Sequence, residues 1–435
     1  MSFSSLSRKR FGLVGTIALF CATCSCVAGC GKPTTSVSSS LSGSSSSSSE
    51  ATINMKNFPN FVSDYSSLPY EFTTKEQTDP FYWGNIMHNE TVLFEGQDDG
   101  SVVGYLRYVP KKIISVRDYT LKKEYVAADE FEINGNKLTL KSASTIGHWT
   151  KKQMAGNEAL PSPYRVVASM ADFRDVNTDL VNMGGTLYTE SPFYWGTQVS
   201  ITYAYDLAEI NLAKFPTYQL DKLTHVKAKL DAKQAIKISG LGDSVLEGCS
   251  SSQKFNHEPY QMDFFDSFGT EIASRFGIEV TRDNEAVGGT TSADGANDAK
   301  LGRIYQAKPD LLLVHYGIND LGAKTTPNGY ADNISYIVTN VKANLPNCDI
   351  ILMSPILPFP GVYDYLMFDR YVNKLQSIAS ISESTIVVDV FHASQELVSN
   401  GKDFYDITGN GINHPNDFGH RFYTGCLLSV MTKLG

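Results

Sequence analysis

From about residue 230 to its C-terminus, the chain alternates short apolar runs with amphipathic stretches. The runs "AIKISGLG", "DLLLVHYG", "CDIILMSPI" and "TIVVDVF" have the length of buried strands, and stretches such as "YADNISYIVTNVKANLP" have helical spacing. Strands that alternate with helices pair in parallel, because a helix brings the chain back to the end of the sheet at which the next strand begins. The pattern predicts an α/β fold with a doubly wound parallel sheet over residues 229–435. Ligand sites in such sheets lie at the carboxyl ends of the strands.

Residues 54–228 show a different pattern, of short β-branched or aromatic runs such as "SVVGYLRYV" and "QVSITYAYD". Asn134-Gly135 stands between two such runs and predicts a hairpin turn. We expect an all-β sandwich domain here. The pentapeptide "PFYWG" occurs at 80–84 and again at 192–196. Its aromatic rings fit core or inter-domain packing better than a sugar-stacking surface.

The N-terminus carries a segment typical of secretion. Arg8-Lys9-Arg10 precedes the apolar stretch "FGLVGTIALFCATCSCVAG", which ends in small residues. The ending "VAGC" resembles the lipobox of bacterial lipoproteins, which implies a signal peptide at 1–29 and a lipid on Cys30. The alternative is an uncleaved transmembrane anchor, since the apolar stretch is just long enough to span a bilayer. Either way, we expect a body tethered to the cell membrane and facing outside the cytoplasm.

Residues 30–53 are rich in serine and predict a flexible tether. The formal charge of −9, without a basic cluster in the body, argues against a nucleic-acid partner. Three cysteines remain beyond the tether, Cys249, Cys348 and Cys426, and they are widely separated. This spacing predicts buried thiols, without a disulfide framework or a zinc site.

Four short motifs follow successive predicted strands. Ser244 stands in "GLGDSVLEG", which lacks the second glycine of the G-x-S-x-G elbow of α/β-hydrolases. Gly289 stands in "NEAVGGTTS", Asn319 in "HYGIND" and His414 in "NHPNDFGH". Taken singly, each motif is compatible with an ordinary turn or helix cap. His315 lies within a predicted strand and His420 within the last helix, so both are expected to be structural.

Together and in this order, the motifs resemble those of the SGNH hydrolases, or GDSL-type esterases. The resemblance covers about residues 234–435 and implies a flavodoxin-like sheet. It assigns Ser244 as the nucleophile and His414 as the base. It also implies an oxyanion hole formed by the Ser244 N–H, the Gly289 N–H and the Asn319 side chain. No metal or organic cofactor is expected.

One position departs from the family pattern. The family usually has Asp-x-x-His, whereas this chain has Gly411 three residues before His414. Another group must then orient the imidazole. Asp406 could fold back from the same loop, or a main-chain carbonyl could accept the Nδ1–H, as in some two-domain acetyl esterases of the family. A glycine leaves the backbone accessible, which slightly favours the carbonyl. Asp417, just after the histidine, is expected to cap a helix.

The resemblance implies a serine carboxylester hydrolase that removes acetyl or other small acyl groups, with an acylated glycan as the expected substrate. A lipid or thioester acylhydrolase is the alternative within enzymes. A non-catalytic, glycan-binding surface lipoprotein is the alternative outside them, and the missing aspartate is its only support.

Overall fold

The computed structural model describes residues 58, 60–65, 68, 70 and 73–433. The predicted signal peptide, the lipid site at Cys30 and the serine-rich tether lie outside the described residues. Within the part of the chain that is described, no helix combines the length and apolarity needed to cross a membrane.

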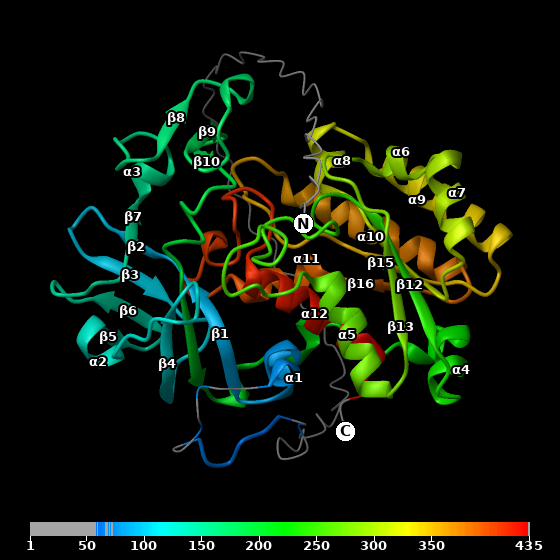
Figure 1. Cartoon of the computed structure of the whole chain (residues 1–435), viewed down its shortest axis with the longest axis horizontal. Coiled ribbons are helices and arrows are strands. Elements are labelled where there is room, and N and C mark those ends of the chain that lie inside the picture. The colour runs from blue at the N-terminus through cyan, green and yellow to red at the C-terminus, as the bar shows by residue number, and fades with distance from the viewer. Residues whose placement is uncertain (1–57, 59, 66–67, 69, 71–72, 434–435) are drawn as a thin grey trace, which may run out of the picture. The chain divides into compact units, whose positions relative to one another are not determined.

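A parallel sheet forms the centre of the C-terminal part, in the order β13-β12-β14-β15-β16 (Figure 1). Its strands in chain order are β12 (Ile236–Gly242), β13 (Val280–Asn284), β14 (Leu311–His315), β15 (Asp349–Met353) and β16 (Thr385–Val388). All four neighbouring pairs are parallel. The order matches the flavodoxin-like type, so the predicted fold class is confirmed.

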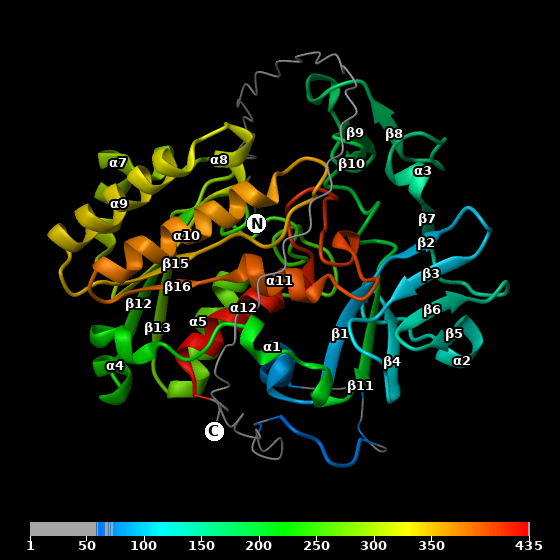
Figure 2. The same ribbon diagram turned by 180° about the vertical axis from the view of Figure 1, so that it is seen from behind.

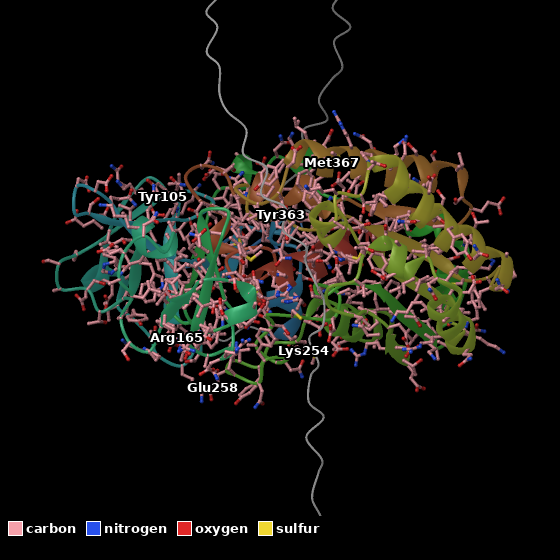
Figure 3. All side chains as sticks on the ribbon, turned by 90° about the horizontal axis from the view of Figure 1, so that it is seen from above. Tyr105, Arg165, Lys254, Glu258, Tyr363 and Met367 are labelled. Atoms are coloured by element: carbon pink, nitrogen blue, oxygen red, sulfur yellow. The ribbon has the colours of Figure 1, made fainter. Side chains whose placement is uncertain are left out.

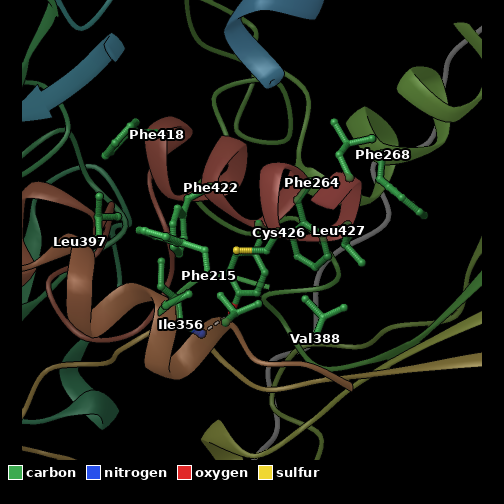
Figure 4. Packing of buried hydrophobic residues seen from close by; sticks show 14 of the residues in the cluster. Phe215, Phe264, Phe268, Ile356, Val388, Leu397, Phe418, Phe422, Cys426 and Leu427 are labelled. Carbon is green, nitrogen blue, oxygen red and sulfur yellow. Dashed lines mark hydrogen bonds between the residues drawn. The ribbon is translucent and has the colours of Figure 1, made fainter. Parts of the chain in front are cut away.

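Helices cover both faces of this sheet. Figure 2 shows α9 (Pro327–Asn344) and α10 (Tyr365–Ile381) side by side over one face, where they pack together with α7 (Asp298–Ala307). On the other face α5 (Phe264–Phe276) packs against α12 (Asp417–Met431). Side chains from these two helices and from β16 interdigitate in the core of that face (Figure 4). Burial on both faces explains why β12, β14, β15 and β16 read as continuous apolar runs, whereas the edge strand β13 is polar.

The N-terminal part is rich in strands and forms three sheets. One has the antiparallel order β1-β11-β4, from β1 (Ile86–Val92), β11 (Val199–Ala204) and β4 (Lys112–Asp118). A second has the order β5-β6-β3-β2-β7, from β5 (Phe131–Asn134), β6 (Lys137–Leu140), β3 (Val102–Tyr105), β2 (Phe94–Gly96) and β7 (His148–Thr150). The third has the order β10-β9-β8, from β10 (Thr186–Tyr188), β9 (Asp179–Met183) and β8 (Arg165–Val167).

The predicted hairpin at Asn134-Gly135 joins β5 to β6, with Asn134 opposite Lys137. Gly135 has a φ of +61°, which a glycine adopts without strain. The pairs β2–β7 and β8–β9 are parallel, so the strand-rich part mixes parallel and antiparallel pairing. Longer connections between these strands permit that pairing.

The strand-rich part and the α/β part share one hydrophobic core. Buried residues of β1, such as Met87 and Val92, belong to the same cluster as Phe418 and Phe422 of α12. The first "PFYWG" contributes Tyr82 and Trp83 to this core, and the second contributes the fully buried Phe193 and Tyr194 to a neighbouring cluster. This confirms the packing interpretation for these rings. The predicted boundary at 228/229 stays a prediction.

Candidate active site

Ser244 lies where the chain leaves the end of β12. Gly242 ends that strand, and a Cβ added there would lie 2.5 Å from the main-chain oxygen of His315. The chain then turns back, with the Cys249 N–H donating to the Ser244 main-chain oxygen at 3.0 Å. The residues after Ser244 form turns, and α5 begins only at Phe264.

The side chain of Asp243 fixes the turn that carries Ser244. Its buried carboxylate accepts the Val245 N–H at 3.0 Å and hydrogen-bonds His315 Nδ1 at 3.2 Å. His315 Nε2 in turn lies 3.0 Å from the Tyr423 hydroxyl. His315 is therefore a core histidine with both ring nitrogens hydrogen-bonded, as predicted.

His414 approaches Ser244 from the loop before α12, with its Nε2 2.8 Å from the Ser244 Oγ. The Asn410 side-chain oxygen holds this loop by accepting the N–H groups of Ile412, Asn413 and His414, each at 3.0 Å. The strand end and the loop thus meet although 170 residues separate them in the chain. Ser244 and His414 are both largely buried, at 7% and 8% exposed, so bulk water does not compete freely for their hydrogen bond.

A glutamate of the strand-rich part binds the other nitrogen of His414. Glu190 follows β10, and its Oε1 lies 2.9 Å from His414 Nδ1. The same oxygen accepts from the Tyr188 hydroxyl at 3.0 Å and from Asn410 Nδ2 at 3.2 Å, and Oε2 accepts from the Ser250 hydroxyl at 3.1 Å. Ser244, His414 and Glu190 therefore form a continuous hydrogen-bonded chain of nucleophile, base and carboxylate.

The two charged groups of this chain shift each other's pKa. Burial alone would raise the pKa of the Glu190 carboxyl, but the charge of His414 and the hydrogen bonds it receives outweigh burial and lower it. Burial alone would lower the pKa of His414, but the Glu190 carboxylate outweighs burial and raises it above the ordinary value. The pair therefore favours an anionic carboxylate and strengthens the imidazole as a base.

Both expectations for the group that orients His414 are wrong. The Asp406 carboxylate accepts the Leu93 N–H at 2.7 Å and lies 3.5 Å from the buried Lys402 ammonium, so it is engaged away from His414. The partner of His414 Nδ1 is the Glu190 carboxylate and not a main-chain carbonyl.

Gly411 is explained by its packing against the strand-rich part. A Cβ at this position would lie 2.4 Å from the Tyr194 ring and 2.5 Å from the main-chain oxygen of Leu187. Its φ of +81° also disfavours a larger residue. Tyr194 of the second "PFYWG" therefore fills the space that a side chain at position 411 would need, and Glu190, two residues before that repeat, supplies the carboxylate.

The remaining predicted residues lie on two segments beside β12. Gly289, with a φ of +78°, lies in a turn after β13. The residue before it, Gly288, lies beside Ser244, since a Cβ on Gly288 would be 3.5 Å from the Ser244 Cβ. No described residue accepts a hydrogen bond from the main-chain N–H of Ser244 or Gly289. Asn319, in α8 (Ile318–Gly322), donates one amide hydrogen to the Thr290 main-chain oxygen at 2.9 Å, which leaves its second amide hydrogen for another acceptor.

The other residues singled out in the sequence have structural environments. His420 is buried in α12, where burial lowers its pKa to about 4 and its Nε2 lies 3.1 Å from the Cys249 main-chain oxygen. The cap of α12 is Asn416, whose side chain accepts the Gly419 N–H, so the expectation that Asp417 is the cap is wrong by one residue. Asp417 instead accepts the Ser252 N–H at 2.8 Å and ties α12 to the segment after Ser244.

Sequence reasoning missed Glu190. Its contact with His414 spans 224 residues, and no spacing rule relates them. The available hint was indirect: the absent aspartate at 411 required a carboxylate from elsewhere, and Glu190 adjoins a repeated aromatic motif.

Comparison with known proteins gives a family match for the segment that contains most of this site. The model of the GDSL-like Lipase/Acylhydrolase family matches residues 241–422. This span includes Ser244, Gly289, Asn319 and His414, whereas Glu190 lies outside it. A curated relative, the PAM2 domain-containing protein UPA2 of Mycosarcoma maydis, is 21% identical over 289 residues, which cover 64% of this chain and 13% of that protein.

Several solved structures resemble the chain distantly. A two-domain esterase (CEX) active on acetylated mannans is 18% identical, with a TM-score of 0.40, over 51% of this chain and 55% of its own. LAE5, an alpha/beta hydrolase enzyme from the metagenome of Lake Arreo, is 20% identical, with a TM-score of 0.38, over 46% of this chain and 96% of its own. A variant of Axe2, an acetyl-xylooligosaccharide esterase from Geobacillus Stearmophilus, is 18% identical, with a TM-score of 0.37, over 46% of this chain and 94% of its own. These similarities are too low to transfer a substrate.

Proposed function

Because the chain carries a GDSL-like lipase/acylhydrolase domain of the SGNH esterase type over residues 241–422, we propose that Ser244, His414 and Glu190 hydrolyse carboxylic esters. The observation that carries this proposal is the continuous pair of hydrogen bonds, 2.8 Å from Ser244 Oγ to His414 Nε2 and 2.9 Å from His414 Nδ1 to Glu190 Oε1. A serine hydroxyl is a weak nucleophile until a base removes its proton, and this geometry supplies the base.

In the proposed reaction, Ser244 Oγ attacks the ester carbonyl carbon while its proton passes to His414 Nε2. Glu190 stabilises the imidazolium and keeps the Nδ1 protonated. The N–H groups of Ser244 and Gly289 and the second amide hydrogen of Asn319 donate to the oxyanion. His414 then gives its proton to the leaving alcohol, and a water molecule activated by the same base hydrolyses the acyl-enzyme.

The proposed substrate is a polysaccharide that carries acetyl or other small acyl groups. The turn beside Ser244 lies at the surface, with Val287 45% exposed, so an ester on a bulky polymer can approach. The order of a strand-rich part followed by the four hydrolase motifs in the sequence resembles that of two-domain acetyl esterases of the SGNH family, which supports the same substrate class. The alternative of a non-catalytic lipoprotein loses its only support, because Glu190 replaces the missing aspartate.

We further propose that the protein is lipidated on Cys30 and faces outside the cytoplasm. The basic residues, the apolar stretch and the "VAGC" ending support this location. Metabolic labelling with a radioactive fatty acid tests it: label should enter the wild type and be lost in Cys30→Ala. Equal labelling of both proteins would contradict lipidation at this residue.

Hydrolysis of 4-nitrophenyl acetate by the wild type and by Ser244→Ala tests the proposed activity. We expect turnover that Ser244→Ala reduces to background, and equal rates in the two proteins would refute the proposal. A series of acetate, butyrate and laurate esters then tests the acyl group. A kcat/KM that falls with chain length supports small-acyl removal, and a rise favours a lipid or thioester acylhydrolase.

A further inference from the structure

One side chain of the segment that carries the nucleophile binds the turn from Val287 to Thr290. The turn begins with the Val287 N–H bonded to the Gly242 main-chain oxygen at 2.9 Å. Its next N–H, that of Gly288, donates to Glu247 Oε2 at 2.7 Å. Glu247 follows Ser244 by three residues, so the segment that carries the nucleophile also carries the acceptor that fixes the turn.

This contact affects the donor that the proposed mechanism needs. Glu247 accepts the Gly288 N–H, so this donor is not available to an oxyanion. The next N–H of the turn belongs to Gly289, and no described residue accepts from it. The turn lies beside the nucleophile, since a Cβ on Gly288 would lie in ordinary contact with the Ser244 Cβ, at 3.5 Å. A small rotation of this turn would therefore change the direction of the Gly289 N–H relative to the reacting carbon.

A carboxylate this close to the oxyanion donors also carries a cost. Its charge opposes the negative charge that develops in the transition state. Lys254 reduces that effect, because its Nζ lies 3.2 Å from Glu247 Oε1. Figure 3 shows Lys254 near the middle of the lower edge of the molecule in that view, and its main-chain N–H donates to the Ser251 hydroxyl at 3.3 Å.

We propose that Glu247 is a positioning residue for the oxyanion turn and that Lys254 neutralises its charge. This inference rests on the proposed function. Glu247 acts through the Gly288 main chain and does not touch the substrate. Glu247 and Lys254 together meet two requirements of the site. Glu247 gives the turn a strong hydrogen-bond acceptor, and Lys254 keeps the surroundings of the oxyanion close to neutral.

The test uses Glu247→Ala, Glu247→Gln, Lys254→Met and the double variant Glu247→Gln/Lys254→Met, with kcat and KM measured separately on 4-nitrophenyl acetate. Glu247→Ala removes the acceptor and should lower kcat about 10–100-fold with KM nearly constant, somewhat less than the loss of a whole oxyanion donor. Glu247→Gln keeps an amide oxygen for the Gly288 N–H and should recover at least tenfold of that loss.

Lys254→Met should lower kcat about 3–10-fold when Glu247 is charged, because the carboxylate is then unbalanced. In the Glu247→Gln background the same change should have almost no effect on kcat. This non-additivity is the mark of neutralisation. A matched control is Glu285→Gln: Glu285 precedes the turn and pairs with Arg303 at 3.2 Å, but no hydrogen bond joins its carboxylate to the turn. Its kcat should equal that of the wild type.

Two results would overturn the inference. One is a Glu247→Ala kcat within twofold of the wild type. The other is a Glu247→Gln variant that is as slow as Glu247→Ala while both unfold at the wild-type temperature.

Hydrogen exchange of the peptide 285–291 tests positioning without any activity. Glu247→Ala should speed exchange of the Gly288 amide, and Glu285→Gln should not. If the wild type and Ser244→Ala hydrolyse the ester equally, the proposed function fails, whereas this exchange measurement still decides the role of Glu247. Unchanged exchange in Glu247→Ala would refute that role.

Discussion

Glu190→Gln should remove the charge beside His414 and keep the geometry of the site. Of the Glu190 oxygens, Oε1 accepts from His414, Tyr188 and Asn410, whereas among the described residues Oε2 accepts only from the Ser250 hydroxyl. A hydroxyl can also accept a hydrogen bond. Glutamine can therefore direct its oxygen at His414 and its amide hydrogens at Ser250, and the change isolates the contribution of the charge.

The distance between the Glu190 carboxylate and His414 Nδ1 sets the size of the expected loss in kcat. A carboxylate oxygen and an imidazolium nitrogen 2.9 Å apart attract by roughly 6 kcal/mol at an effective dielectric constant of about 20. The amide dipole recovers part of this attraction. We expect a loss of about 3–5 kcal/mol in transition-state stabilisation, which corresponds to roughly 10²–10⁴-fold in kcat. Amidation of the orienting aspartate costs a serine protease about 10⁴.

The assay is hydrolysis of 4-nitrophenyl acetate at the pH of maximal rate. Glu190→Ala should be at least as slow as Glu190→Gln, because it loses the acceptor as well as the charge. The control is Glu95→Gln, a change of the same kind in the strand-rich part, where Glu95 pairs with Lys151 at 3.1 Å. A folded Glu190→Gln variant with a kcat within about threefold of the wild type would refute the argument.

Three further predictions concern the same site. Since Glu190 raises the pKa of His414, the wild-type kcat/KM should fall on the acid side at a pH above the ordinary histidine value of about 6.5, and Glu190→Gln should move this limb to lower pH; an unmoved limb would contradict the coupling. Gly411→Asp, which restores the family pattern, should lower the free energy of unfolding in urea by about 2–5 kcal/mol from left-handed strain and overpacking against Tyr194; a variant as stable as the wild type would contradict the packing argument. Asp406→Asn should leave kcat within about threefold and its pH profile unmoved; a loss of orders of magnitude with the fold intact would restore Asp406 as the orienting group.

The sheet and most of the site followed from the sequence because their patterns are local. The buried strands β12 and β14 are continuous apolar runs, and the motifs that contain Ser244 and Asn319 follow them closely. Strand ends meet at one edge of a parallel sheet, so order along the chain was enough to bring Ser244 and Asn319 to the same edge. The hairpin at Asn134-Gly135 was predictable for the same reason, since two adjacent residues specify it.

The origin of the acid was not predictable in this way. Glu190 reaches His414 through the packing of the strand-rich part on the loop before α12, in which Tyr194 fills the space above Gly411. Such packing depends on tertiary contacts that no periodicity encodes. Spacing along the chain points only to carboxylates near His414, and of these Asp406 forms a buried ion pair with Lys402 instead.

The most direct test of the central claim is the rate at which a fluorophosphonate labels the protein, followed by peptide mapping of the adduct. Labelling reports activation of the nucleophile whatever the natural ester. We predict one adduct, on Ser244, that forms at least 100-fold more slowly in Glu190→Ala than in the wild type or in Glu95→Gln. An adduct on another residue, or equal labelling rates in Glu190→Ala and the wild type, would contradict a triad completed by the strand-rich part.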